Sequence, residues 1–187
     1  MKIVYCLFGT YSVGGIERVT TVKANWLAEH GHEVYLVTTG HAGRPPYYPL
    51  HPSIKHIDLG LCYEVQGAIS RFEAYRRNLP KYRKHKELLE ELFAEIRPDI
   101  AVAAGWHEGT FLYQIKDGSK KIIEHHIWRN ANFALYSLYL KQMSHVTLLR
   151  RVKSGLLTLW NRWLTYKQGR YDRQFDRLVV LTEEDKT

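Results

Sequence analysis

Apolar positions follow two different periods along this chain. Short continuous apolar runs, typical of strands buried on both faces of a sheet, recur six times, at residues 2–8, 33–39, 54–59, 100–104, 121–125 and 178–181. Between most of them lie longer segments in which apolar residues repeat every three or four positions, as on one face of a helix. This alternation predicts a parallel sheet with helices on both faces, so the expected fold class is a doubly wound, Rossmann-like α/β domain.

Two helices can be placed from this pattern. The first covers residues 16–29, ends at His30 and Gly31, and is expected to turn one apolar stripe to the core: Ile16, Val19, Val22, Trp26 and Leu27. The second covers residues 80–96 and stops at Arg97 and Pro98; its apolar positions are Leu88, Leu89, Leu92, Phe93 and Ile96. Residues 40–53 predict a long ordered loop, and residues 60–78 show no convincing period.

The most informative stretch joins the first apolar run to the first helix, at residues 8–18. A strand that runs into Gly14 and Gly15 and then turns straight into a helix leaves free backbone N–H groups at the positive end of a helix dipole. Such a place suits phosphate, carboxylate or sugar hydroxyls, and the alternative is a tight turn without a ligand. Neither the lysine and Ser/Thr of an NTPase P-loop nor the glycine spacing of a dinucleotide site is present.

Composition restricts the class of protein. With 187 residues the chain suits one domain, and no apolar run approaches the roughly 18–20 residues that a membrane-spanning helix needs. The start of the chain reads as a core strand rather than a signal peptide. Cys6 and Cys62 show no disulfide or metal spacing, so we expect a reducing, cytoplasmic compartment.

The net charge of +8 is concentrated near the end of the chain, where residues 141–177 hold nine Lys or Arg against two Asp. Within residues 145–168, Trp160 and Trp163 stand among leucines and basic residues that include Arg150, Arg151 and Lys153. A helix of this kind suits the headgroup layer of an anionic membrane. The alternative is a helix packed on the sheet or on a further domain. No nucleic-acid reading motif accompanies the charge, so nucleic acid is not an expected partner.

The last ten residues predict a strand and then a helix start, with Thr182 as N-cap and acidic residues in the first turn. The sequence stops there. We therefore expect residues 1–187 to be the N-terminal half of a longer protein.

Five motifs, in this order and spacing, resemble glycosyltransferase family 4, the retaining, sugar-nucleotide-dependent enzymes of the two-domain B-type fold. They are GGIERV at 14–19, LxxxGHEV at 27–34, RPDI at 97–100, IIEHH at 122–126 and VVLTEEDK at 179–186. The resemblance implies that residues 1–187 form the N-terminal, acceptor-binding domain, inactive by itself. The C-terminal donor-binding domain, with its Glu-x7-Glu motif, is absent from this chain. The implied reaction moves a sugar from a nucleotide-sugar donor to a glycan or lipid-linked acceptor, without a metal or other cofactor.

The same resemblance assigns roles to single residues. It implies that Gly14 and Gly15 lie near the donor phosphates and the acceptor. It also implies that His125, at the end of the fifth strand, is the catalytic residue, which contacts the donor sugar or the reacting centre. His126 stands where many relatives have Asn and could share this contact, and the sequence does not show which of the two rings points into the cleft. From the residues alone, the alternative is a pair of strand-end histidines satisfied by the backbone.

Further substrate-binding candidates follow the first and fourth strands. Glu17 and Arg18 lie in the first helical turn, where Glu17 could bind an acceptor hydroxyl, unless it is simply a solvated helix start. Trp106 and His107 follow the fourth strand, where an aromatic ring beside polar groups suits a sugar face, and a core tryptophan is the alternative. The close histidine pairs, His30 with His32 and His125 with His126, lack the spacing of a zinc site, so no metal is expected.

Two other classes of function stay open on the sequence alone. One is a non-catalytic module that binds a sugar or a phosphate in the same crevice. The other is a membrane-surface scaffold that acts through the basic helix.

Overall fold

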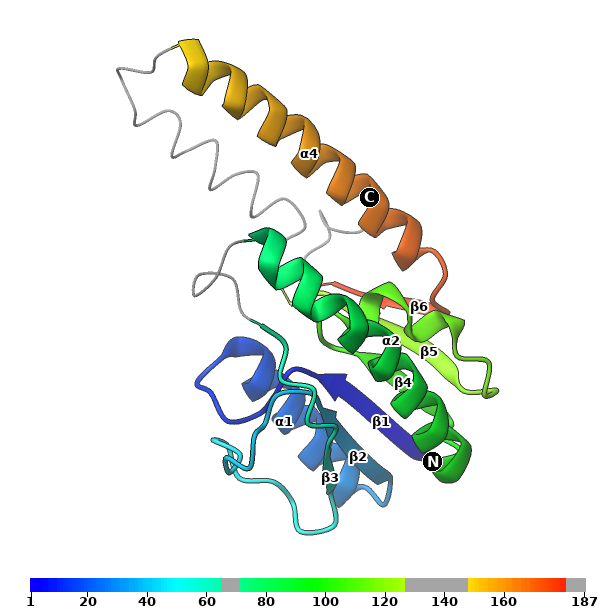
Figure 1. The fold of residues 1–187 in the computed structure, drawn as a ribbon. Helices are drawn as coiled ribbons and strands as arrows, with labels where there is room; N and C mark the ends of the chain where they lie inside the picture. The colour runs from blue at the N-terminus through cyan, green and yellow to red at the C-terminus, as the bar shows by residue number, and fades with distance from the viewer. Residues whose placement is uncertain (65–70, 127–147, 181–187) are drawn as a thin grey trace.

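The computed structural model describes residues 1–64, 71–126 and 148–180, which form one parallel sheet with helices on both faces (Figure 1). The strands are β1 (Lys2–Leu7), β2 (Glu33–Thr38), β3 (Lys55–Asp58), β4 (Ile100–Ala103), β5 (Lys120–Glu124) and β6 (Arg177–Val179). The helices are α1 (Gly15–Glu29), α2 (Arg71–Ile96) and α4 (Leu148–Asp172), with single 3₁₀ turns η1 (Glu108–Thr110) and η2 (Leu112–Gln114). The strand order β3-β2-β1-β4-β5-β6 confirms the doubly wound α/β fold.

Side chains alternate across the sheet and build two core layers. From β1, Val4 and Cys6 face the layer that holds Leu89, Phe93 and Ile96 of α2. Ile3, Tyr5 and Leu7 face the opposite layer, with Ala24 and Ala28 of α1. The predicted inner face of the second helix is thus confirmed, because three of its five apolar residues are buried.

The core-facing stripe predicted for the first helix is wrong. The residues that α1 buries are Thr20, Thr21, Ala24 and Ala28, whereas Val19, Val22 and Trp26 are exposed. Small side chains let this helix approach the sheet closely, and its larger apolar residues then fall on the outer side. The predicted helix end is confirmed, since Gly31 takes a positive φ of 80° after His30.

Helix α2 begins nine residues before the predicted start and carries Pro80 inside it. Residues 71–78 are therefore helical, which corrects their assignment to a segment without period. The inner face there carries Ala74 and Asn78, while Tyr75 and Leu79 are exposed, so no apolar stripe marks it. Asn78 instead ties the helix to the backbone of Glu64 through two hydrogen bonds of 2.9 and 3.2 Å.

The edges of the sheet differ from the prediction that all strands are buried. In β6, Leu178 and Val179 are exposed, and in β3 no residue is fully buried. The predicted helix start at Thr182 lies outside the described residues. Among the residues that the structure describes, no helix is long and apolar enough to cross a bilayer.

Residues 40–53 form the predicted ordered loop, which is fixed against the loop that follows β1. The backbone N–H of Tyr47 donates to the carbonyl of Thr10 at 2.8 Å, and the guanidinium of Arg44 stacks on the ring of Tyr11. Asp58 accepts a hydrogen bond from the backbone N–H of Ala42 at 3.0 Å. The two loops therefore form one layer over the carboxyl ends of β1 and β2.

Candidate active site

Parallel strands bring all their carboxyl ends to one edge, and ligands in open α/β sheets bind outside that edge where the strand order reverses. Here the reversal lies between β1 and β4, which pair directly. The loop that contains Gly14 and Gly15, called the glycine loop below, follows β1. Trp106 and His107 follow β4, and His125 and His126 follow β5. The structure therefore places every predicted site residue at this edge or in the first turn of α1.

The two glycines serve different purposes. Both lie outside the left-handed region, and Gly14 has an extended φ of −119°. A Cβ at Gly14 would meet the carboxylate of Glu17, which folds back over it and accepts a hydrogen bond from Ser12 Oγ at 2.5 Å. A Cβ at Gly15 would meet no atom within 4 Å. Close approach by Glu17 thus explains Gly14, while Gly15 borders open space at the start of the helix.

Helix α1 starts at this loop, and the backbone N–H of Arg18 donates to the carbonyl of Gly14 at 3.0 Å. The side chain of Arg18 is exposed. Glu17, half-buried, places its negative charge at the positive end of the helix dipole. Its carboxylate is positioned by Ser12 and can exchange that hydroxyl for another one.

Trp106 and His107 are adjacent in sequence but lie in different surroundings, one exposed and the other packed against neighbouring rings. Trp106 is 65% exposed, which rules out the alternative of a core tryptophan. His107 stacks on Tyr63 with ring centroids 3.8 Å apart, and its Nδ1 lies 3.1 Å from the hydroxyl of Tyr82 on α2. Burial lowers the pKa of His107 to about 4, so the ring is neutral near pH 7. Trp106 therefore projects from the sheet edge on a loop that His107 anchors.

A buried polar group that the sequence pattern does not reveal lies beneath this loop. Glu108 is 1% exposed, and its Oε1 lies 3.6 Å from Nε2 of the fully buried His85, too far for a strong hydrogen bond. The Nδ1 of His85 lies 3.0 Å from the hydroxyl of Tyr63. Burial raises the pKa of Glu108 to about 7 and lowers the pKa of His85 to about 3. A histidine in the middle of an amphipathic helix was the only available sequence signal.

The imidazole of His125 turns toward α4. Its Nε2 lies 3.0 Å from Oδ1 of Asp172, whose side chain is 3% exposed, whereas the side chain of His125 is 27% exposed. Its backbone N–H donates to the carbonyl of Val179 in β6 at 2.9 Å. The ring therefore contacts Asp172 on one side, and part of it is exposed to solvent.

The ring of His126 turns toward the opposite face of the sheet. Its Nε2 lies 3.1 Å from Oε2 of Glu124, and Lys23 of α1 pairs with the same oxygen at 2.8 Å. Burial acts to raise the pKa of Glu124, but His126 and Lys23 outweigh it and hold that pKa below its ordinary value. The side chain of His126 is 7% exposed, so His125 is the more accessible of the two rings.

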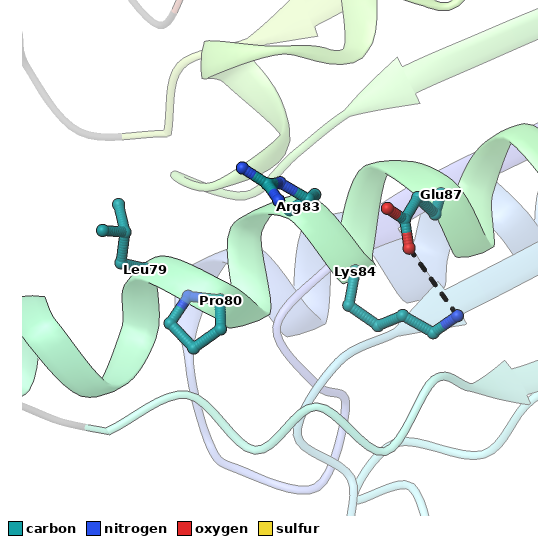
Figure 2. A pocket seen from close by; sticks show the side chains of 5 residues that line it. All are labelled: Leu79, Pro80, Arg83, Lys84 and Glu87. Carbon is teal, nitrogen blue, oxygen red and sulfur yellow. Dashed lines mark ion pairs between the residues drawn. The ribbon is translucent and has the colours of Figure 1, made fainter.

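A hollow of about 340 Å³ lies away from these groups, on the outer face of α2 (Figure 2). Its described lining residues are Leu79, Pro80, Arg83, Lys84 and Glu87. At 100° per residue this face is opposite the one that carries His85 and Leu89, so the hollow belongs to the helix surface rather than to the sheet edge. Within residues 1–64, 71–126 and 148–180, no group of three His, Cys, Asp or Glu side chains is placed to hold a metal ion.

Comparison with known families decides where the chain belongs. The model of the family described as Glycosyltransferase Family 4 matches residues 13–187. The chain belongs to this family. No curated protein sequence gives a significant match.

Solved structures show the same fold for this family 4 chain. The sucrose-phosphate synthase from Thermosynechococcus elongatus superimposes with a TM-score of 0.52 and 15% identity over 72% of the chain. A UGT transferase from Siraitia grosvenorii, solved in complex with UDP, gives a TM-score of 0.51 and 12% identity over 97% of the chain. The neighbours are glycosyltransferases of the B-type fold. The chain spans 35% and 44% of their respective lengths.

Proposed function

We propose that this chain is the acceptor-binding domain of a retaining glycosyltransferase, in which a further domain binds the nucleotide-sugar donor. The acceptor is a glycan or a lipid-linked sugar. The observation that carries the proposal is the shared sheet edge, where the open glycine loop at the start of α1 and the partly exposed His125 both lie. Membership in glycosyltransferase family 4 supports it.

In this proposal the glycine loop meets the charged and hydroxylated parts of the substrates. Nothing lies within 4 Å of a Cβ at Gly15, so a phosphate or a sugar can approach the backbone N–H groups of the first helical turn. Glu17 exchanges its bond to Ser12 for one to an acceptor hydroxyl, and Arg18 contributes a positive charge beside it. Gly14 allows the carboxylate to fold back when no acceptor is bound.

The other side of the edge supplies an aromatic surface and the catalytic imidazole. Trp106 packs on a sugar face, and His107 holds the Trp106 loop in place through Tyr63. His125 hydrogen-bonds the donor sugar or stabilises charge at the reacting centre without a metal. His126, whose ring lies against Glu124 on the α1 side, is the second candidate for this contact.

The surface of helix α4 favours a lipid-linked acceptor. Its described part exposes Leu159, Trp160, Trp163 and Tyr166, at the spacing of one helix face. Lys167 lies 5.1 Å from the Trp163 ring centre, and Arg162 and Arg170 are exposed. Aromatic and basic side chains in this combination suit an anionic bilayer surface, so we propose that α4 docks the enzyme where its acceptor is held.

The proposal is tested in the longer protein that contains this chain. Purified enzyme is mixed with common nucleotide sugars and candidate acceptors, and the anomeric configuration of the first product is read by NMR. Retention of the donor's configuration is expected, together with a large loss of turnover in Gly15→Leu but not in Ala94→Leu, a control that also introduces a leucine at an exposed position, on α2. Inversion would contradict the retaining reaction. Binding of sugars without any turnover would instead support the non-catalytic module.

A further inference from the structure

Asp172, the last residue of helix α4 (Figure 1), contacts the imidazole that the proposed function uses, and Gln168 of the same helix contacts Asp172. Oδ1 of Asp172 lies 3.0 Å from Nε2 of His125. The amide Nε2 of Gln168, one turn earlier in α4, donates to the same oxygen at 3.0 Å. One oxygen of a buried carboxylate therefore contacts both an amide donor and the imidazole.

The chemistry of this contact fixes the tautomer of the ring. An ionised carboxylate only accepts hydrogen bonds, so the proton between Asp172 and His125 must sit on Nε2 of the imidazole. In the neutral ring, Nδ1 is then the unprotonated nitrogen and acts as an acceptor. The backbone that carries the ring is held as well, because the N–H of His125 donates to the carbonyl of Val179.

We infer that Asp172, supported by Gln168, is a positioning residue for His125 and sets which nitrogen the site presents. This inference rests on the proposed role of His125. It deepens that role, because a neutral ring with its proton on Nε2 presents Nδ1 as an acceptor for a sugar hydroxyl rather than as a donor. Asp172 itself, at 3% exposure, stays out of contact with the substrate.

The tautomer can be measured without any transferase assay. In ¹⁵N-labelled protein at pH 8.5, two-bond ¹H–¹⁵N correlation spectra distinguish the two neutral forms of each histidine. We expect His125 in the Nε2–H form. In Asp172→Asn the amide can also donate to Nε2, so a measurable share of the Nδ1–H form should appear. Asp176→Asn is the matched control, since Asp176 binds the backbone N–H of Lys121 and should leave His125 unchanged.

Two results would overturn the inference: a wild-type His125 in the Nδ1–H form, or the same tautomer populations in wild type and Asp172→Asn. In the active longer protein, Asp172→Asn should lower kcat by at least roughly 10-fold with little change in KM, because a ring in the wrong tautomer presents the wrong nitrogen. If His125→Ala keeps its activity, the proposed function fails, while the tautomer spectra still decide the role of Asp172.

Discussion

The carboxyl group of Glu108 makes the stability of this fold depend on pH in a direction opposite to that of most acidic side chains. Its pKa is raised from 4.5 to about 7 by burial, so the folded state binds the proton more tightly than the unfolded state. The stabilising contribution of the neutral form is complete below about pH 4.5. It is lost as the pH rises through about 7.

The size of the effect follows from the shift. With a pKa of 4.5 in the unfolded state and about 7 in the folded state, the contribution of Glu108 to the free energy of unfolding falls by at most about 2.5 kcal/mol between pH 5 and pH 8. Glu108→Gln removes the ionisable group and keeps its shape. The variant should therefore match wild type within about 1 kcal/mol at pH 5 and exceed it by up to about 2–3 kcal/mol at pH 8.

Urea denaturation at both pH values, followed by circular dichroism, measures the two free energies of unfolding. In the folded protein the buried His85 and His107 stay neutral at both pH values, because burial lowers their pKa values to about 3 and about 4. Glu95→Gln, on the exposed side of α2, is the matched control and should give no pH-dependent difference. A difference between wild type and Glu108→Gln that does not grow from pH 5 to pH 8 would refute the reasoning.

Two further predictions concern the sheet edge and the α4 surface. Gly105→Ala should lower the free energy of unfolding by about 1–3 kcal/mol, measured by thermal denaturation, because its Cβ would clash with the buried carboxylate of Glu108. Gly15→Ala should change it by no more than about 0.5 kcal/mol, and equal losses would contradict this packing. In flotation assays the protein should bind anionic vesicles and leave them at 1 M salt, where the Debye length is about 3 Å. The double variant Arg162→Gln, Lys167→Gln should weaken this binding by up to about 2 kcal/mol. Equal binding to neutral vesicles, or none to either kind, would show that α4 has another role.

The fold could be predicted because it depends on period and order. The six apolar runs correspond to the six strands, and Gly31 and Arg97 mark helix ends that the structure confirms. The inner faces were harder to predict. A large apolar residue such as Trp26 has the same period whether it faces the core or the solvent, and only the approach distance of α1 decides between them.

The candidate site was predicted in its parts but not in its connections. His125 and Trp106 follow strand ends in the sequence, so their place at the edge could be inferred from topology. The partners Asp172 and His85 could not, because no local pattern marks such contacts: Asp172 lies 47 residues along the chain from His125, and His85 lies 22 residues from Tyr63. The buried Glu108 resembles an ordinary polar turn residue in the sequence, and only its burial sets it apart.

The rate of sugar transfer by His125→Ala, measured in the longer protein that contains this chain, tests the central claim most directly. His51→Ala, a change to a partly exposed loop histidine, is the control, and the melting temperature of each variant checks that it is folded. Removal of one positioned hydrogen-bonding group at the reacting centre should lower kcat by roughly 10²–10³-fold, with the control near wild type. A folded His125→Ala enzyme with near-normal kcat would contradict the assignment of this sheet edge as the active site.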